Sequence, residues 1–243
     1  MYPSLPGNLS LWSVKKTRVA YAKADALKQE DEPRGHHCIS MLLLSRVYIF
    51  IVADNSNVLK IIDTEPFLLR PANYPEDAPG KGFCIIPVGK KKVGVVNMSG
   101  RTFMSPMDCP FRLGDKILNF LKKNCDVILI DFHAEATSEK IAFANYVDGR
   151  ATAVVGTHTH VQTADEQILP KGTAYITDLG MVGAANSILG MAIEPVIARF
   201  TTGRPSKFEV AEGAAIYCAV LIETNDKTNK VFKIERIFLK QRP

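Results

Sequence analysis

The hydrophobic pattern of the chain becomes regular beyond Asn55, where helix-like and strand-like segments follow one another. Apolar residues at helical spacing predict helices over three ranges: 113–123, 137–147 and 192–200. Short apolar or alternating runs predict strands over seven ranges: 82–88, 92–98, 126–132, 151–156, 173–177, 214–223 and 230–239. This mixture of elements predicts one substantial α/β domain over residues 54–243.

Residues 1–53 differ from the rest, because they carry scattered basic residues and no sustained period. We expect this segment to be aberrant or poorly ordered, although residues 47–53 could supply one strand. The apolar run over residues 41–53 is interrupted by Arg46 and is too short to span a membrane. No membrane partner is therefore expected.

The charge and the cysteine content limit the expected partners and the expected location of the protein. The formal net charge is +5, a mild excess spread along the chain. We therefore expect a small anionic substrate and do not expect DNA as a partner. The five cysteines are odd in number and form no CxxC pair, which argues against a disulfide framework. The expected location is the reducing cytoplasm.

Three of the five histidines lie at predicted strand ends and are candidate metal ligands. His133 ends one strand, and His158 and His160 follow another. An H-x-H pair in extended chain points both imidazoles to one side, about 6–7 Å apart, so each ring can serve a different metal of a close pair. Imidazole suits Zn, Mn, Fe and Ni.

Polar residues near these histidines could orient the rings in the manner usual around bound metals: Asp131, Glu135, Thr157 and Asp178. Two plainer interpretations stay open, namely that the H-x-H pair is incidental and that His133 is a buried histidine with satisfied hydrogen bonds. The cluster His36-His37-Cys38 stands in unpatterned sequence and favours an accidental grouping.

Longer stretches around these residues resemble the YmdB-type metallophosphoesterases, a calcineurin-like family. The matching stretches are RPANYPEDAPGKG (70–82), GRTF (100–103), DFHAEATSEK (131–140), DGRATAVVGTHTHVQTADEQILPKGTAYITDLGM (148–181) and FEVAEG (208–213). The resemblance implies a metallo-dependent phosphatase fold, with two packed sheets flanked by helices in four layers. It also implies hydrolysis of phosphodiesters, notably 2′,3′-cyclic nucleotides, and allows a homo-oligomer.

The resemblance further implies a centre of two divalent metals, Fe, Mn or Zn. Its pattern assigns His133 and His160 to one metal and His158 to the other. Arg70, Asn73 and Arg101 are the candidate contacts to substrate, where the arginines could stabilise charge on the phosphate. The plainer interpretation of both arginines, as surface salt-bridge residues, stays open. Neither the motifs nor the spacing identifies a catalytic residue.

The amino-terminal part departs from the family pattern. The aspartate of a GDI-type strand end, an ENAA-type segment and a GNHTWD segment are all missing, and Phe50 and Ile51 stand where asparagine and histidine would be. The match resumes abruptly at Asp54, which indicates either a reading-frame change or genuine divergence. We therefore expect altered or missing amino-terminal strands, one bound metal or none, and impaired turnover. The alternative is a non-catalytic descendant that binds a nucleotide or a protein.

Overall fold

The computed structural model describes residues 48–49 and 60–241. In the first of these ranges β1 (Tyr48–Ile49) pairs in parallel with β2 (Leu68–Leu69), so part of the strand expected over residues 47–53 is present. The cluster His36-His37-Cys38 and the replacements at Phe50 and Ile51 lie outside the described residues.

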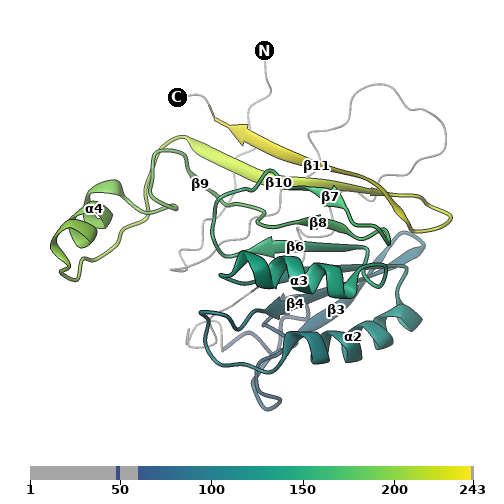
Figure 1. Ribbon diagram of the computed structural model, residues 1–243. Coiled ribbons are helices and arrows are strands. Elements are labelled where there is room, and N and C mark those ends of the chain that lie inside the picture. The colour runs from purple at the N-terminus through teal and green to yellow at the C-terminus, as the bar shows by residue number, and fades with distance from the viewer. Residues whose placement is uncertain (1–47, 50–59, 242–243) are drawn as a thin grey trace.

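A six-stranded mixed sheet is the centre of the domain (Figure 1). Its strands, in spatial order, are β3 (Phe83–Val88), β4 (Lys91–Ser99), β5 (Val127–His133), β6 (Ala153–Thr157), β8 (Ala174–Ile176) and β7 (Gln167–Ile168). The four inner strands β4, β5, β6 and β8 run parallel, whereas β3 and β7 are antiparallel edge strands. The carboxyl ends of four strands therefore meet at one edge.

Helices α2 (Pro110–Asn124) and α3 (Thr137–Val147) cover one face of this sheet (Figure 1). Leu118 and Leu121 of α2 and Phe143 of α3 pack there on alternate residues of the strands. The ring of Phe143 stacks on Phe132, with centroids 4.3 Å apart. Even-numbered residues of β5 thus face the helices, which turns Asp131 and His133 to the opposite face.

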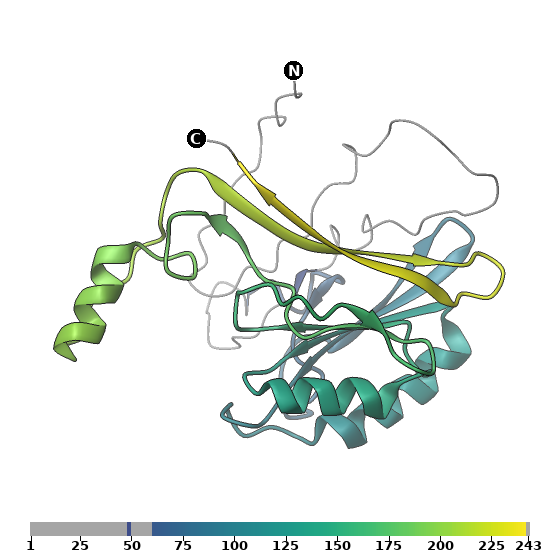
Figure 2. The same cartoon turned by 45° about the horizontal axis from the view of Figure 1, so that its top comes forward.

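A second sheet packs across that opposite face, as Figure 2 shows. It consists of β9 (Val182–Ala184), β10 (Ala215–Thr224) and β11 (Val231–Lys240), all antiparallel. Val155 and Ile176 of the first sheet meet Val220 of β10 in a small apolar core. Two packed sheets, with helices on the outer face of the six-stranded one, confirm the predicted α/β fold class (Figure 1).

Helix α4 (Ile193–Thr202) lies apart from both sheets beyond β9 (Figure 1). Pro195 falls in its first turn, where no intrahelical N–H is needed, and Gly203 ends it in the left-handed region. In the described ranges no helix covers the outer face of the three-stranded sheet, and none is long and apolar enough to cross a membrane.

The helices predicted over residues 113–123, 137–147 and 192–200 and the longer strands are present, with ends shifted by a few residues. Their order and the antiparallel pairing of β10 with β11 also agree with the alternation in the sequence. Strands β2, β7 and β9 were not predicted, because two or three residues are too few to show a period.

Candidate functional site

The parallel strands of the central sheet contribute polar residues to its carboxyl edge. His133 is the last residue of β5, and Thr157 is the last residue of β6 and its direct cross-strand partner. Asp178 follows β8 by two residues. Because parallel strands end together, residues far apart in sequence come together at this edge.

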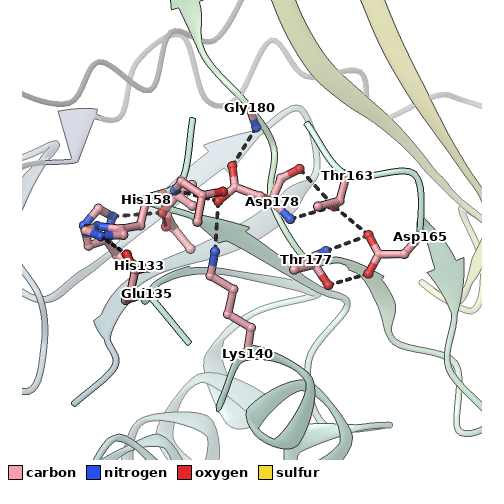
Figure 3. Close-up of polar contacts among 12 residues, drawn as sticks. His133, Glu135, Lys140, His158, Thr163, Asp165, Thr177, Asp178 and Gly180 are labelled. Carbon is pink, nitrogen blue, oxygen red and sulfur yellow. Dashed lines mark hydrogen bonds and ion pairs between the residues drawn. The ribbon is translucent and has the colours of Figure 1, made fainter. Parts of the chain in front are cut away.

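The imidazoles of His133 and His158 are in direct contact (Figure 3). Nε2 of His133 lies 2.8 Å from Nδ1 of His158, and the rings are nearly perpendicular with centroids 4.6 Å apart. The other nitrogen of His158, Nε2, lies 2.7 Å from a carboxylate oxygen of Glu135. Two of the three predicted ligands, and the predicted partner Glu135, are thus brought together.

A hydrogen-bond relay holds the ring of His133 from behind. The hydroxyl of Thr157 donates to Asp131 over 2.7 Å and lies 3.2 Å from Nδ1 of His133. Because this hydroxyl donates its hydrogen bond to Asp131, its oxygen can accept a hydrogen bond from Nδ1–H of His133, which leaves Nε2 as the nitrogen with a lone pair. The predicted orienting role of Asp131 and Thr157 has this geometric support.

His133 is a neutral imidazole in this environment. Burial lowers its pKa from the ordinary value to about 3, with further contributions from His158, Lys140 and His160. Its side chain is only 2% exposed, so there is little water to stabilise an imidazolium. Neutral imidazole is the form that binds a metal ion.

His160 lies near enough to the pair to contribute to the lowered pKa of His133, but the ring contact itself joins only His133 and His158 among the described residues. Burial lowers its pKa, while a hydrogen bond to the backbone of Leu189 raises it. In the parts of the chain that the structure describes, no group of three His, Cys, Asp or Glu side chains is close enough to hold one metal ion. The structure therefore joins His133 with His158, not all three rings.

The predicted extended geometry of the H-x-H pair is wrong. His158 has a φ of 110° and His160 a φ of 68°, so the segment is a turn in which side chains do not alternate as in a strand. The turn is anchored at Thr159, whose backbone N–H donates to Asp178 over 3.0 Å. This anchor had no signal in the spacing of the histidines.

Arg70 and Asn73, two of the expected substrate contacts, hold backbone in place. The guanidinium of Arg70 is buried and donates to four backbone carbonyls between Pro71 and Pro79. The amide of Asn73 is fully buried and bonds both N–H and C=O of Ser99 and the carbonyl of Asp108. These bonds occupy most of the donors of both side chains, so the geometry favours a structural role for each over contact with a phosphate.

Arg101 remains the expected residue with an exposed guanidinium, in the loop after β4. Two oxygens of Glu139 accept hydrogen bonds from the backbone N–H groups of Arg101 and Thr102 over 3.0–3.1 Å. A Cβ at Gly100 would lie 2.6 Å from the same carboxylate, so this glycine lets the loop close on α3. The loop is thereby held beside the carboxyl edge.

Two residues at this edge escaped sequence analysis. Asn97 of β4 is fully buried next to Asp131, and among the described residues its side-chain amide has no hydrogen-bond partner. Lys140 of α3 is 1% exposed and lies 2.9 Å from Asp178. Lys140 lies on the apolar face of a predicted helix, which is a sequence signal for a buried lysine. A single asparagine in a strand, such as Asn97, gives no such signal.

The donor set fits a divalent transition metal in chemistry. A neutral imidazole oriented by a hydroxyl and a carboxylate is the usual environment of a ligating histidine, and Asn97 leaves a buried polar group to be satisfied. The fit extends to His133 and His158, whose facing nitrogens would have to separate to admit a metal ion.

Comparison with known proteins agrees with the fold and the motifs. Residues 51–237 match the family described as YmdB-like protein. The chain is 53% identical over 186 residues to a 2′,3′-cyclic-nucleotide 2′-phosphodiesterase of Bacillus subtilis, covering 76% of this chain and 70% of that protein.

Solved structures with the same fold include a hypothetical protein from Thermus thermophilus. It is 40% identical, with a TM-score of 0.76, and the match covers 83% of this chain and 80% of that one. A phosphatase from Mycoplasma pneumoniae is 33% identical, with a TM-score of 0.74 and coverage of 83% and 75%. These likenesses support a hydrolase, and the match over residues 51–237 shows that the chain belongs to the YmdB-like protein family.

Proposed function

We propose that the chain derives from a metal-dependent phosphodiesterase that acts on 2′,3′-cyclic nucleotides or related phosphodiesters. It retains part of the active site of that enzyme. The observation that carries the proposal is the contact of His133 with His158 at the carboxyl edge, backed by the relay through Thr157 and Asp131. The activity of the relative from Bacillus subtilis supports the choice of substrate.

In this proposal His133 and His160 would hold one divalent metal and His158 the other, as the family pattern implies, although the two rings in contact here are those of His133 and His158. When bound, the metals supply an activated hydroxide and neutralise charge on the phosphate. Asp131 and Thr157 keep Nε2 of His133 free to coordinate, Glu135 fixes the ring of His158, and Arg101 provides a cation for the phosphate. A His133 that is already neutral has no proton to lose on binding metal.

The chain as written has few ligands for two metals. Three neutral imidazoles contribute no negative charge, so they offset little of the repulsion between two dications a few ångströms apart. We therefore expect one metal or none to bind, and turnover to be low. We also propose that residues 54–243 form the metallophosphoesterase domain and that residues 1–53 are an aberrant segment outside it. Sequencing the gene upstream of Asp54 tests it, and a GNHTWD segment in another frame would support a reading-frame change.

Metal content and hydrolysis of 2′,3′-cyclic AMP, measured on the purified full chain with and without added Mn²⁺, test the function. We expect substoichiometric metal and weak hydrolysis, both lost in His133→Gln. Arg112→Gln removes a surface ion pair with Asp108 and serves as the control, because both of its side chains are well exposed. Absence of metal binding and hydrolysis in the unaltered chain would leave a non-catalytic binding protein, whereas two tightly bound metals with full turnover would contradict the impairment.

We also propose a cytoplasmic location for the protein. In the described part of the chain Cys84, Cys109, Cys125 and Cys218 are all free thiols. Reduced thiols of this number fit a reducing compartment. Alkylation of the native protein released from cells under non-reducing conditions should modify the accessible thiols; a purified chain with its cysteines oxidised in disulfides would contradict this location.

A further inference from the structure

Lys140 and Asp178 form an ion pair that is almost completely buried at the candidate site. Nζ of Lys140 lies 2.9 Å from Oδ2 of Asp178, and each side chain is 1% exposed (Figure 3). Burying two charges is costly, and it is tolerated where further hydrogen bonds satisfy both groups. The pair therefore calls for an explanation beyond simple stabilisation of the fold.

The lysine reaches Asp178 by crossing β6 at a glycine. A Cβ at Gly156 would lie 3.1 Å from Cδ of Lys140 and 1.7 Å from the carbonyl oxygen of Thr177. Glycine is thus required at this position both for the close approach of the following strand and for the lysine stem. The helix α3, the strand β6 and the segment after β8 are joined in this way.

Asp178 links the ion pair to the turn over residues 157–160, called the histidine turn below. Its Oδ2, the oxygen bound to Lys140, also accepts the hydrogen bond from Thr159 N–H, and its Oδ1 accepts one from Gly180 N–H over 2.9 Å. Thr159 stands between His158 and His160, which both have positive φ. Such backbone conformations are unfavourable for these residues and persist only where their surroundings fix them.

We propose that Lys140 and Asp178 are positioning residues, which fix the turn over residues 157–160 and so aim the imidazoles of His158 and His160. This inference deepens the proposed function and rests on it for the use made of those rings. Lys140 holds the carboxylate in one orientation, and the carboxylate holds the backbone between the two histidines. Neither residue contacts substrate or metal in this role.

The first test measures hydrogen exchange of the Thr159 amide by NMR in the metal-free protein. Lys140→Met leaves Asp178 buried without its cation, and we expect exchange at Thr159 to become faster by at least about tenfold. Asp178→Ala should produce the same or a larger change. Asp178→Asn keeps an oxygen for Thr159 but loses the ion pair, so its exchange rate should lie between those of the wild type and Asp178→Ala.

Asp148→Asn is the matched control for a general loss of stability. Asp148 is also buried and accepts two backbone hydrogen bonds, from Lys171 and Thr173, at the other end of α3 and β6. Its loss should leave exchange at Thr159 and the imidazole NMR signals of His158 and His160 unchanged. The Lys140 and Asp178 variants should shift those signals.

Equal exchange at Thr159 in the wild type and in Asp178→Ala would overturn the proposal, as would unchanged imidazole signals. Should Lys140→Met not fold, the comparison of Asp178→Asn with Asp178→Ala still decides. Titration with Co²⁺ separates this result from the proposed function. If the wild type binds no Co²⁺ while the Asp178 variants still loosen Thr159, the metal site fails and the positioning role stands. If Co²⁺ binds, we expect Asp178→Ala to weaken it by about tenfold or more.

Discussion

Nε2 of His133 lies 2.8 Å from Nδ1 of His158, although 25 residues separate the two histidines in sequence. The parallel register of β5 and β6 produces this contact, because it pairs His133 with Thr157 directly. A shift of the register by one residue would turn His133 and Asp131 toward the helices and separate them from the histidine turn. The site therefore depends on the pairing of the central strands as much as on its own residues.

The relay behind His133 gives a first prediction. Thr157→Val keeps the shape of the side chain but removes the hydroxyl that joins Asp131 to Nδ1 of His133. We expect the free energy of unfolding in urea to fall by about 1–3 kcal/mol, since two buried polar groups lose a partner. The ¹⁵N shifts of the His133 ring should also report a changed tautomer.

Thr201→Val is the control for that experiment. The hydroxyl of Thr201 bonds only to backbone carbonyls on the exposed surface of α4. Its loss should change stability by no more than about 0.5 kcal/mol. If Thr157→Val were as mild as this control, the relay would contribute nothing to the fold or to the ring.

The elements that sequence analysis predicted are those with long periods or distinctive strand ends. His133 was placed correctly at the end of β5, because the apolar run before it is long and buried. The turn at His158 and His160 was missed, because its positive φ values depend on Asp178, which is nearly 20 residues away. Contacts of that kind arise from the packing of three elements and leave no periodic signal.

Asn97 gives a second prediction, on the stability of the sheet. Its side chain is fully buried beside Asp131, and neither its oxygen nor its nitrogen has a hydrogen-bond partner among the described residues. Asn97→Leu replaces it with an apolar side chain of similar size, so we expect the protein to become more stable by about 1–3 kcal/mol. Urea unfolding measures this, and a loss of stability would contradict the prediction.

Asp165 gives a third prediction, on the dependence of stability on pH. Burial alone would raise the pKa of Asp165, but hydrogen bonds from Thr163 and Thr177 outweigh it and the pKa is lowered. The unfolded chain therefore takes up a proton at a higher pH than the folded chain does. The stabilisation is complete above the unfolded pKa, near 4, and is lost as the pH falls below it.

Asp165→Asn removes this titration and provides the comparison. The difference in urea midpoint between the wild type and the variant should be largest at pH 6–7 and should shrink as the pH is lowered from about 4 toward 3. Other carboxylates titrate in both proteins and cancel. A difference that stays constant over this range would show that Asp165 has the same pKa in the folded and unfolded chains.

Gly156 gives the fourth prediction. Comparing it with Gly172 separates the cost of a close contact from the cost of backbone strain when glycine is replaced by alanine. A Cβ at Gly156 would lie 1.7 Å from the carbonyl oxygen of Thr177, a backbone atom that can move only if β6 and the segment after β8 move apart. Gly172, in contrast, has a positive φ of 104° but no atom within 4 Å of the added Cβ. Gly172→Ala should therefore cost only the strain of its conformation, about 1–3 kcal/mol.

We expect Gly156→Ala to cost more than Gly172→Ala, beyond about 4 kcal/mol, and to leave little folded protein. Thermal unfolding followed by circular dichroism gives the ranking. The reason lies in the site, because the same contact brings Thr177 and Asp178 against β6 and leaves room for the stem of Lys140. If Gly156→Ala folds as well as Gly172→Ala, the strands must separate at little cost, and the close junction of α3, β6 and the Asp178 segment would not be what holds the histidine turn.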